Sequence, residues 1–101
     1  MNPRFLQKIN SPKPVVVDFY ADWCVPCKQV TPVLKALKQE LKGIRIVKVN
    51  VDINPFIAGK YNVRRLPTIM VFIAGEPVWS GEGLYSTREL RSILVQELSR
   101  D

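Results

Sequence analysis

Both cysteines of the chain lie in one short motif, Trp23-Cys24-Val25-Pro26-Cys27-Lys28. The motif follows an apolar run over residues 14–20 that is typical of a buried parallel strand, and it precedes a segment with helical periodicity. The cysteines are therefore expected where a strand passes into a helix, next to backbone N–H groups that lack intrahelical partners. Such groups and the helix dipole stabilise an anion, so they favour a thiolate at Cys24. The motif predicts a redox pair in which Cys24 attacks a disulfide and Cys27 resolves the intermediate.

Three other interpretations of the cysteine pair are weaker. A structural disulfide closing a loop of about four residues would stabilise the fold by only about 2 kcal/mol. A zinc site normally needs four ligands, and the chain has no histidine and no third cysteine. Two unrelated thiols would rarely fall at this spacing at a strand–helix junction. One alternative stays open, a binding module in which two chains share a metal or iron–sulfur cluster through four cysteines.

The bulk composition indicates one globular domain over residues 1–101, because 47% hydrophobic residues are enough for a single core. The net charge of +6 raises nucleic acid as a partner, but the lysines are scattered and no basic stripe is interleaved with aromatics. We therefore expect no nucleic-acid binding. No run approaches membrane-spanning length and no export signal is evident, so we expect a cytoplasmic protein without membrane contact. In that reducing compartment a C-x-x-C pair is more often catalytic than structural.

Asp18 is the misfit of the first predicted strand, Val15 to Tyr20. An acid in an apolar strand is desolvated, which raises its pKa and suits it to exchange protons with a nearby thiol. The competing interpretation is a structural aspartate held by hydrogen bonds.

The rest of the chain alternates between helical and strand patterns. From Cys27 an amphipathic helix is predicted, kinked at Pro32 and capped by Gly43, and residues 44–51 form a second strand in a right-handed parallel crossover. Residues 1–13 permit one short helix, and residues 52–61 a loop and another short helix. A strand over residues 68–73 turns at residues 74–76 into an antiparallel strand over residues 77–80. A capping box at Ser86 starts the last helix, whose predicted apolar face is Leu90, Ile93, Leu94 and Leu98.

Several of these segments together resemble thioredoxin. The matching pieces run in order along most of the chain: residues 17–28, Pro32, residues 49–52, residues 66–68, Gly75 and Gly83. The resemblance implies a thioredoxin-like α/β fold with helices on both faces of a four-stranded mixed sheet in the order second, first, third, fourth. It also implies a monomeric protein-disulfide reductase without a bound cofactor. Its partners would be disulfide-containing proteins and a separate thioredoxin reductase that supplies electrons from NADPH.

The resemblance also assigns roles to individual residues. Cys24 matches the attacking cysteine and Cys27 the resolving one, while Asp18 matches the buried acid beneath them and Lys48 its partner. Pro67 matches a cis-proline that frees the backbone of Leu66 to pair with an extended substrate. An exposed apolar patch usually marks a binding site, and the substrate patch expected around Cys24 consists of Trp23, Val25, Pro26, Leu66, Pro67, Gly83 and Leu84.

Two departures from the family pattern carry expectations of their own. Val25 stands where thioredoxin usually has glycine, which is expected to change the redox potential and partner choice, and a specialised reductant of one dedicated partner is therefore an alternative. Few residues precede Val15, so the N-terminal edge strand is expected to be missing or rudimentary.

Arg64, Arg65 and Glu82 are expected to rim the substrate patch with charge, and the arginines would favour acidic substrates.

Overall fold

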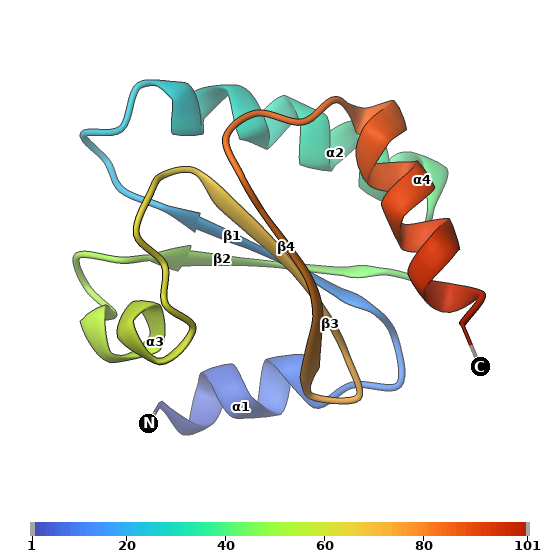
Figure 1. Cartoon of the computed structure of the whole chain (residues 1–101), viewed down its shortest axis with the longest axis horizontal. Coiled ribbons are helices and arrows are strands. Elements are labelled where there is room, and N and C mark those ends of the chain that lie inside the picture. Colours follow the sequence, from blue (N-terminus) through green and yellow to red (C-terminus); the bar gives the residue numbers. More distant parts are fainter. Residues whose placement is uncertain (1, 101) are drawn as a thin grey trace.

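A computed structural model describes residues 2–100 and contains one four-stranded sheet (Figure 1). The strands are β1 (Val15–Tyr20), β2 (Arg45–Asn50), β3 (Thr68–Ile73) and β4 (Glu76–Glu82). Their order is β2-β1-β3-β4. β1 pairs parallel with β2 and antiparallel with β3, and β3 pairs antiparallel with β4. The predicted mixed sheet and its strand order are confirmed.

Helices cover both faces of this sheet (Figure 1). α2 (Val30–Glu40) and α4 (Thr87–Leu98) lie on one side, and α1 (Pro3–Ile9) and α3 (Pro55–Lys60) lie on the other. A 3₁₀ segment, Pro26–Gln29, precedes α2. The predicted two-sided covering is confirmed, and it explains why β1 is apolar on both faces.

Alternation along β1 divides the core into two clusters, since successive side chains of a strand point to opposite faces. Val15, Val17 and Phe19 belong to the cluster beneath α1 and α3. Val16 belongs to the cluster beneath α2 and α4, with residues such as Leu34 from α2 and Leu94 from α4. Asp18 has the parity of Val16, so the strand directs its carboxyl toward the α2 side.

Aromatic rings fill the cluster beneath α1 and α3. Phe72 of β3 makes edge-to-face contacts with Phe5 and Tyr61, at centroid distances of 6.1 and 5.2 Å. Such geometry is the preferred one for aromatic pairs. Buried Phe5 thus holds α1 on the sheet, and Ile57 together with the half-buried Tyr61 just after α3 holds that helix, as expected when a helix is too short to be stable alone.

The segment after the cysteines differs from the single kinked helix that the sequence predicted. The α-helical part begins only at Val30, after the 3₁₀ segment, so Pro32 lies in the first turn of α2. A first-turn proline loses no intrahelical bond, because N–H groups there have no partner in any case. The predicted kink at Pro32 is therefore wrong. The irregularity lies before Pro32, where the segment changes from 3₁₀ to α geometry.

The predicted cap at Gly43 is also wrong. α2 ends at Glu40, and Leu41 closes it by donating its N–H to the carbonyl of Leu37 at 2.8 Å. Gly43 is not among the glycines with positive φ in residues 2–100, which are Gly75 and Gly83. The helix therefore ends without the left-handed glycine that the prediction assumed.

The N-terminal and C-terminal elements follow the sequence more closely. Within residues 2–14 the structure has α1 and no strand, as expected. The capping box of α4 is confirmed, because Ser86 and Glu89 exchange hydrogen bonds of 3.0 and 2.8 Å. Leu98, predicted to lie on the apolar face of α4, is 52% exposed. Across residues 2–100, every helix is too short or too polar to cross a bilayer.

Candidate active site

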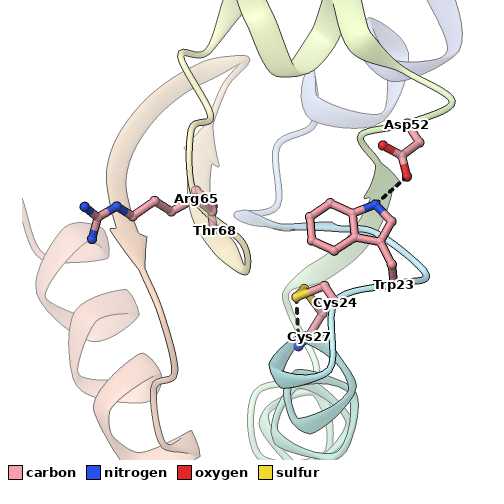
Figure 2. Close-up of a disulfide and its surroundings, with 6 residues drawn as sticks. All are labelled: Trp23, Cys24, Cys27, Asp52, Arg65 and Thr68. Carbon is pink, nitrogen blue, oxygen red and sulfur yellow. Dashed lines mark hydrogen bonds between the residues drawn. A yellow bond between two sulfur atoms is a disulfide. The ribbon is translucent and has the colours of Figure 1, made fainter.

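Cys24 and Cys27 form a disulfide between the end of β1 and the start of α2 (Figure 2). Cys24 precedes the 3₁₀ segment and Cys27 lies inside it. The backbone N–H of Cys27 points to the sulfur of Cys24, with an N···S distance of 3.3 Å. A helical turn thus directs a backbone donor at one sulfur of the pair. In the dithiol state the same donor would stabilise a thiolate on Cys24.

The two cysteines are nearly covered, whereas the residues beside Cys24 are open. Each cysteine is 4% exposed, but Trp23 is 68% exposed and Val25 is 69% exposed. Large exposed apolar side chains next to a reactive group are unusual unless another molecule covers them. A partner that reaches the disulfide therefore meets Trp23 and Val25 first.

Trp23 is held by a residue that the sequence analysis did not single out for a role in the site. Its indole N–H donates to a carboxylate oxygen of Asp52 at 2.9 Å (Figure 2). The side-chain oxygen of Asn50, at the end of β2, accepts from the backbone N–H groups of Asp52 and Ile53 at 2.9 and 3.3 Å. Asn50 and Asp52 lie within residues 49–52, a segment that matched the family, and this was the available signal.

Asp18 is completely buried in β1, and neither carboxyl oxygen has a hydrogen-bond partner among the described residues. Desolvation raises the pKa of Asp18 from 3.8 to about 6, and the positive charge of Lys48 opposes part of this rise. The alternative of a hydrogen-bonded structural aspartate is therefore wrong. A carboxyl with such a pKa can take up and release a proton close to neutral pH.

Lys48 lies opposite Asp18 in the parallel register of β1 and β2, but the two side chains form no ion pair within residues 2–100. The ammonium of Lys48 instead donates to the hydroxyl of Thr31 at 3.1 Å. It also lies 4.9 Å from the centre of the Tyr20 ring. Lys48 thus acts on Asp18 through its electric field and not through a hydrogen bond, which refines the partnership that the resemblance implied.

A cavity of about 290 Å³ borders Cys27, Thr31 and Lys48 on this side of the sheet. Tyr20 and Lys28 also line it. The cavity is open to solvent, so protons can reach the surroundings of Cys27 without crossing the apolar core. Thr31 had no predicted role, and only its contact with Lys48 indicates one.

The loop before β3 brings a second segment to the disulfide. The Leu66–Pro67 peptide bond is cis, as the resemblance implied. Leu66 packs against the small cluster that contains Ala21, Cys24 and Cys27. Within residues 2–100 neither backbone group of Leu66 has a backbone hydrogen-bond partner. These groups are free to pair with an extended chain.

The remaining residues of the predicted substrate patch differ in exposure. Gly83 adopts φ of +91° and donates its N–H to the carbonyl of Pro67 at 2.8 Å, so β4 is tied to the cis-proline loop. Pro67 itself is buried, whereas Pro26 is exposed and Leu84 is 50% exposed. The open part of the patch therefore comprises Trp23, Val25, Pro26 and Leu84.

The charged rim that the sequence predicted around the substrate patch is weaker at the arginines than expected. The side chain of Arg65 points away from the disulfide (Figure 2). Its carbonyl accepts a hydrogen bond from the hydroxyl of Thr68 at 2.5 Å, and the guanidinium of Arg64 donates to Asn62 at 3.0 Å. Arg65 thus lies beside the patch in sequence without being directed at the cysteines.

Comparisons with known proteins agree with this geometry. The thioredoxin family model matches residues 1–96. A thioredoxin of Porphyra purpurea is 44% identical over 92 residues, covering 90% of this chain and 86% of the relative. A thioredoxin of Rickettsia felis is 43% identical over 83 residues, covering 81% of this chain and 79% of the relative.

Solved structures show the same likeness. Mitochondrial thioredoxin 3 of Saccharomyces cerevisiae, in its oxidised form, superposes with a TM-score of 0.82 at 34% identity, covering 91% of this chain and 87% of the other. A mutant thioredoxin of Halobacterium salinarum superposes with a TM-score of 0.89 at 31% identity, covering 100% and 88%. With its Cys24–Cys27 disulfide, buried acid and cis-proline loop, the chain belongs to the thioredoxin family, whose members are thiol-disulfide oxidoreductases.

Proposed function

We propose that this protein reduces disulfides in other proteins, with Cys24 as the attacking residue and Cys27 as the resolving residue. The observation that carries the assignment is the N–H of Cys27 directed at the sulfur of Cys24, 3.3 Å away. This contact favours the thiolate on Cys24, and the thiolate is the nucleophile in disulfide exchange.

The reaction proceeds in two exchanges. The Cys24 thiolate attacks one sulfur of the substrate disulfide, which forms a mixed disulfide and releases the other substrate sulfur as a thiolate that takes up a proton. Cys27 then loses its proton, to Asp18 or to water in the adjoining cavity, and its thiolate attacks the sulfur of Cys24. The substrate leaves as a dithiol, and the protein is left with the Cys24–Cys27 disulfide.

A further turnover needs two electrons from outside the protein. We infer that a separate NADPH-dependent thioredoxin reductase supplies them by reducing the Cys24–Cys27 disulfide. The same exposed residues, Trp23 and Val25, would be the first that this partner meets. Oxidation of NADPH in a mixture of this protein, a thioredoxin reductase and insulin would support the inference, and NADPH oxidation that does not depend on this protein would contradict it.

Trapping separates the roles of the two cysteines. Cys27→Ser leaves Cys24 able to attack but removes the resolving thiol, so it should accumulate a mixed disulfide with a substrate protein. Cys24→Ser, the matched control, should accumulate none. Non-reducing electrophoresis after incubation with oxidised insulin measures both. Equal trapping by the two variants would contradict the assignment of the roles.

A further inference from the structure

The side of the molecule that carries α1 and α3 has an apolar groove outside the substrate patch. Phe56 is 84% exposed and Ile53 is 75% exposed, more than any other large apolar side chain in residues 2–100. Both line a groove of about 500 Å³ along α3, together with Pro55, Ile57 and Lys60. A space of that size accepts one or two large side chains of another molecule.

A second, more polar groove adjoins the first. Asn2, Asn54 and Ile57 line both, so the two form one continuous depression between α1 and α3. The second groove is bordered by Arg4 and Lys8, which lie one turn apart on α1. The depression therefore has an apolar end at Phe56 and a basic end at Lys8.

The charged residues that line this depression are all basic. No aspartate or glutamate lines either groove. Arg45 adds a further cation at the basic end, because its guanidinium donates to the carbonyl of Lys8 at 3.0 Å. In residues 2–100 the ion pairs are Arg91–Glu40 and Arg100–Glu97, so Arg4, Lys8 and Arg45 have no acidic partner there.

The depression is connected to the redox site through one hydrogen-bonded pair. Asp52 holds the indole of Trp23 and is followed directly by Ile53, the first apolar residue of the groove. A chain that covers Trp23 at the disulfide can therefore continue over Ile53 and Phe56 toward α1, which lies beside α3 on the same side of the sheet (Figure 1).

We propose that this depression binds a segment of a disulfide-bearing partner protein in which a large apolar side chain is followed by acidic residues. The apolar side chain packs between Ile53 and Phe56, and the carboxylates lie near Arg4, Lys8 and Arg45. The inference rests on the proposed function, since the partner's disulfide occupies the site at Cys24. The depression then selects among the disulfide proteins that the cysteines alone would not distinguish.

Direct binding tests the inference without using the redox reaction. The probe is a fluorescently labelled, cysteine-free peptide with one phenylalanine followed by a run of glutamates, titrated with the oxidised protein and followed by anisotropy. Phe56→Ala should weaken binding about tenfold, the loss expected for one buried aromatic contact. Arg4→Glu with Lys8→Glu should weaken it about tenfold at low salt and less at high salt, because salt screens exposed charges.

Matched controls lie on the opposite side of the sheet. Val95→Ala removes an exposed apolar side chain from α4, and Lys35→Glu with Lys42→Glu makes the same charge change on and just after α2. Both controls should bind the peptide as the wild type does. Equal weakening by the controls, equal binding of a peptide with lysines in place of glutamates, or tighter binding of a single-stranded oligonucleotide of equal charge would overturn the inference.

Reduction of a small aromatic disulfide by the wild type distinguishes a failure of peptide binding at the depression from a failure of the proposed disulfide reduction. If the wild type reduces the small disulfide but does not bind the peptide, the inference fails and the proposed function stands. If it does not reduce the small disulfide, the proposed function itself fails. When the peptide is joined to a disulfide substrate, kcat/KM for the wild type should rise about tenfold over the lysine version, and Arg4→Glu with Lys8→Glu should abolish most of that gain.

Discussion

The two faces of β1 have opposite tasks, although the same six residues form both. Val15, Val17 and Phe19 are fully buried in an entirely apolar cluster closed by aromatic rings. On the other face Val16 is followed by Asp18, whose buried carboxyl has no hydrogen-bond partner among the described residues. One face stabilises the fold, and the other accepts a cost in stability close to the cysteines.

The position of that cost explains its use. A buried unpaired carboxyl is unfavourable wherever it occurs in a core, and proteins retain such groups chiefly at functional sites. Asp18 lies near the end of β1 from which the chain runs on to Cys24. In the proposed mechanism the face with the acid supplies a proton carrier, and the apolar face supplies the stability that tolerates it.

Truncation on the apolar face should have the largest effect. Phe72→Ala leaves a cavity between Phe5 and Tyr61, and large-to-small changes of phenylalanine in a core cost about 3–5 kcal/mol of unfolding free energy. Urea denaturation of the oxidised protein measures the loss. The control is Val95→Ala, because the side chain of Val95 on α4 is 53% exposed, and this variant should change the unfolding free energy by less than about 0.5 kcal/mol. Similar losses for both variants would mean that the aromatic cluster does not dominate stability.

Removing the acid on the other face should have the opposite sign. The folded pKa of Asp18, about 6, is above its unfolded value of 3.8, so ionisation disfavours the folded state. The penalty is absent below pH 3.8, grows between the two values and is constant above about pH 6. A shift of about two pH units corresponds to about 3 kcal/mol, so Asp18→Asn should be about 2–3 kcal/mol more stable than the wild type near neutral pH.

Denaturation of Asp18→Asn and wild type across the pH range measures this difference. The gain should disappear in acid, where the wild-type carboxyl is protonated. Asp18→Asn should also resolve mixed disulfides more slowly, since it cannot accept a proton. A stability difference that is the same at all pH values would remove the claim that an ionisable buried acid causes it.

A smaller effect should follow from the neighbour of Asp18. Lys48 lowers the pKa of Asp18 against the larger effect of burial. Lys48→Met should therefore raise the pKa of Asp18 further and move the steep part of the stability profile to higher pH. Carbon-13 NMR titration of the Asp18 carboxyl in the oxidised protein measures the change. Lys35→Met, an exposed lysine on α2, is the control, and equal shifts in both variants would show that only net charge matters.

The smallest effect is expected at the rim, which belongs to neither face. Arg65 points away from the disulfide, so Arg64→Glu with Arg65→Glu should slow reduction of an acidic disulfide peptide by about twofold at low salt, with the potential of the cysteine pair unchanged. Second-order rates for acidic and basic peptides at low and high salt give the answer. A tenfold reversal of preference would show that these arginines lie closer to the substrate than the structure places them.

Local sequence patterns were enough to predict the cysteine pair, the first strand and the start of the last helix. The three-residue spacing of Cys24 and Cys27, the apolar run of β1 and the capping box at Ser86 are short-range features, and the sequence alone located all three. The helix after Cys27 was located but its geometry was wrong, since apolar periodicity does not distinguish a 3₁₀ turn from the first turn of an α-helix. The cis bond at Pro67 came from the family resemblance.

Only the tertiary structure decided which distant residues meet. The hydrogen bond from Trp23 to Asp52 spans 29 positions and that from Lys48 to Thr31 spans 17, and no local pattern encodes either contact. The burial of Asp18 could be expected from its strand, but its lack of a partner depends on where Lys48 turns. The depression between α1 and α3 likewise exists only because chain packing brings Phe56 and Lys8 to one side of the sheet. The sequence alone determined the reactive pair and the strand that precedes it, because residue spacing and side-chain alternation are local features. Long-range packing decided the residues around the pair that change its proton transfer and contact its partners.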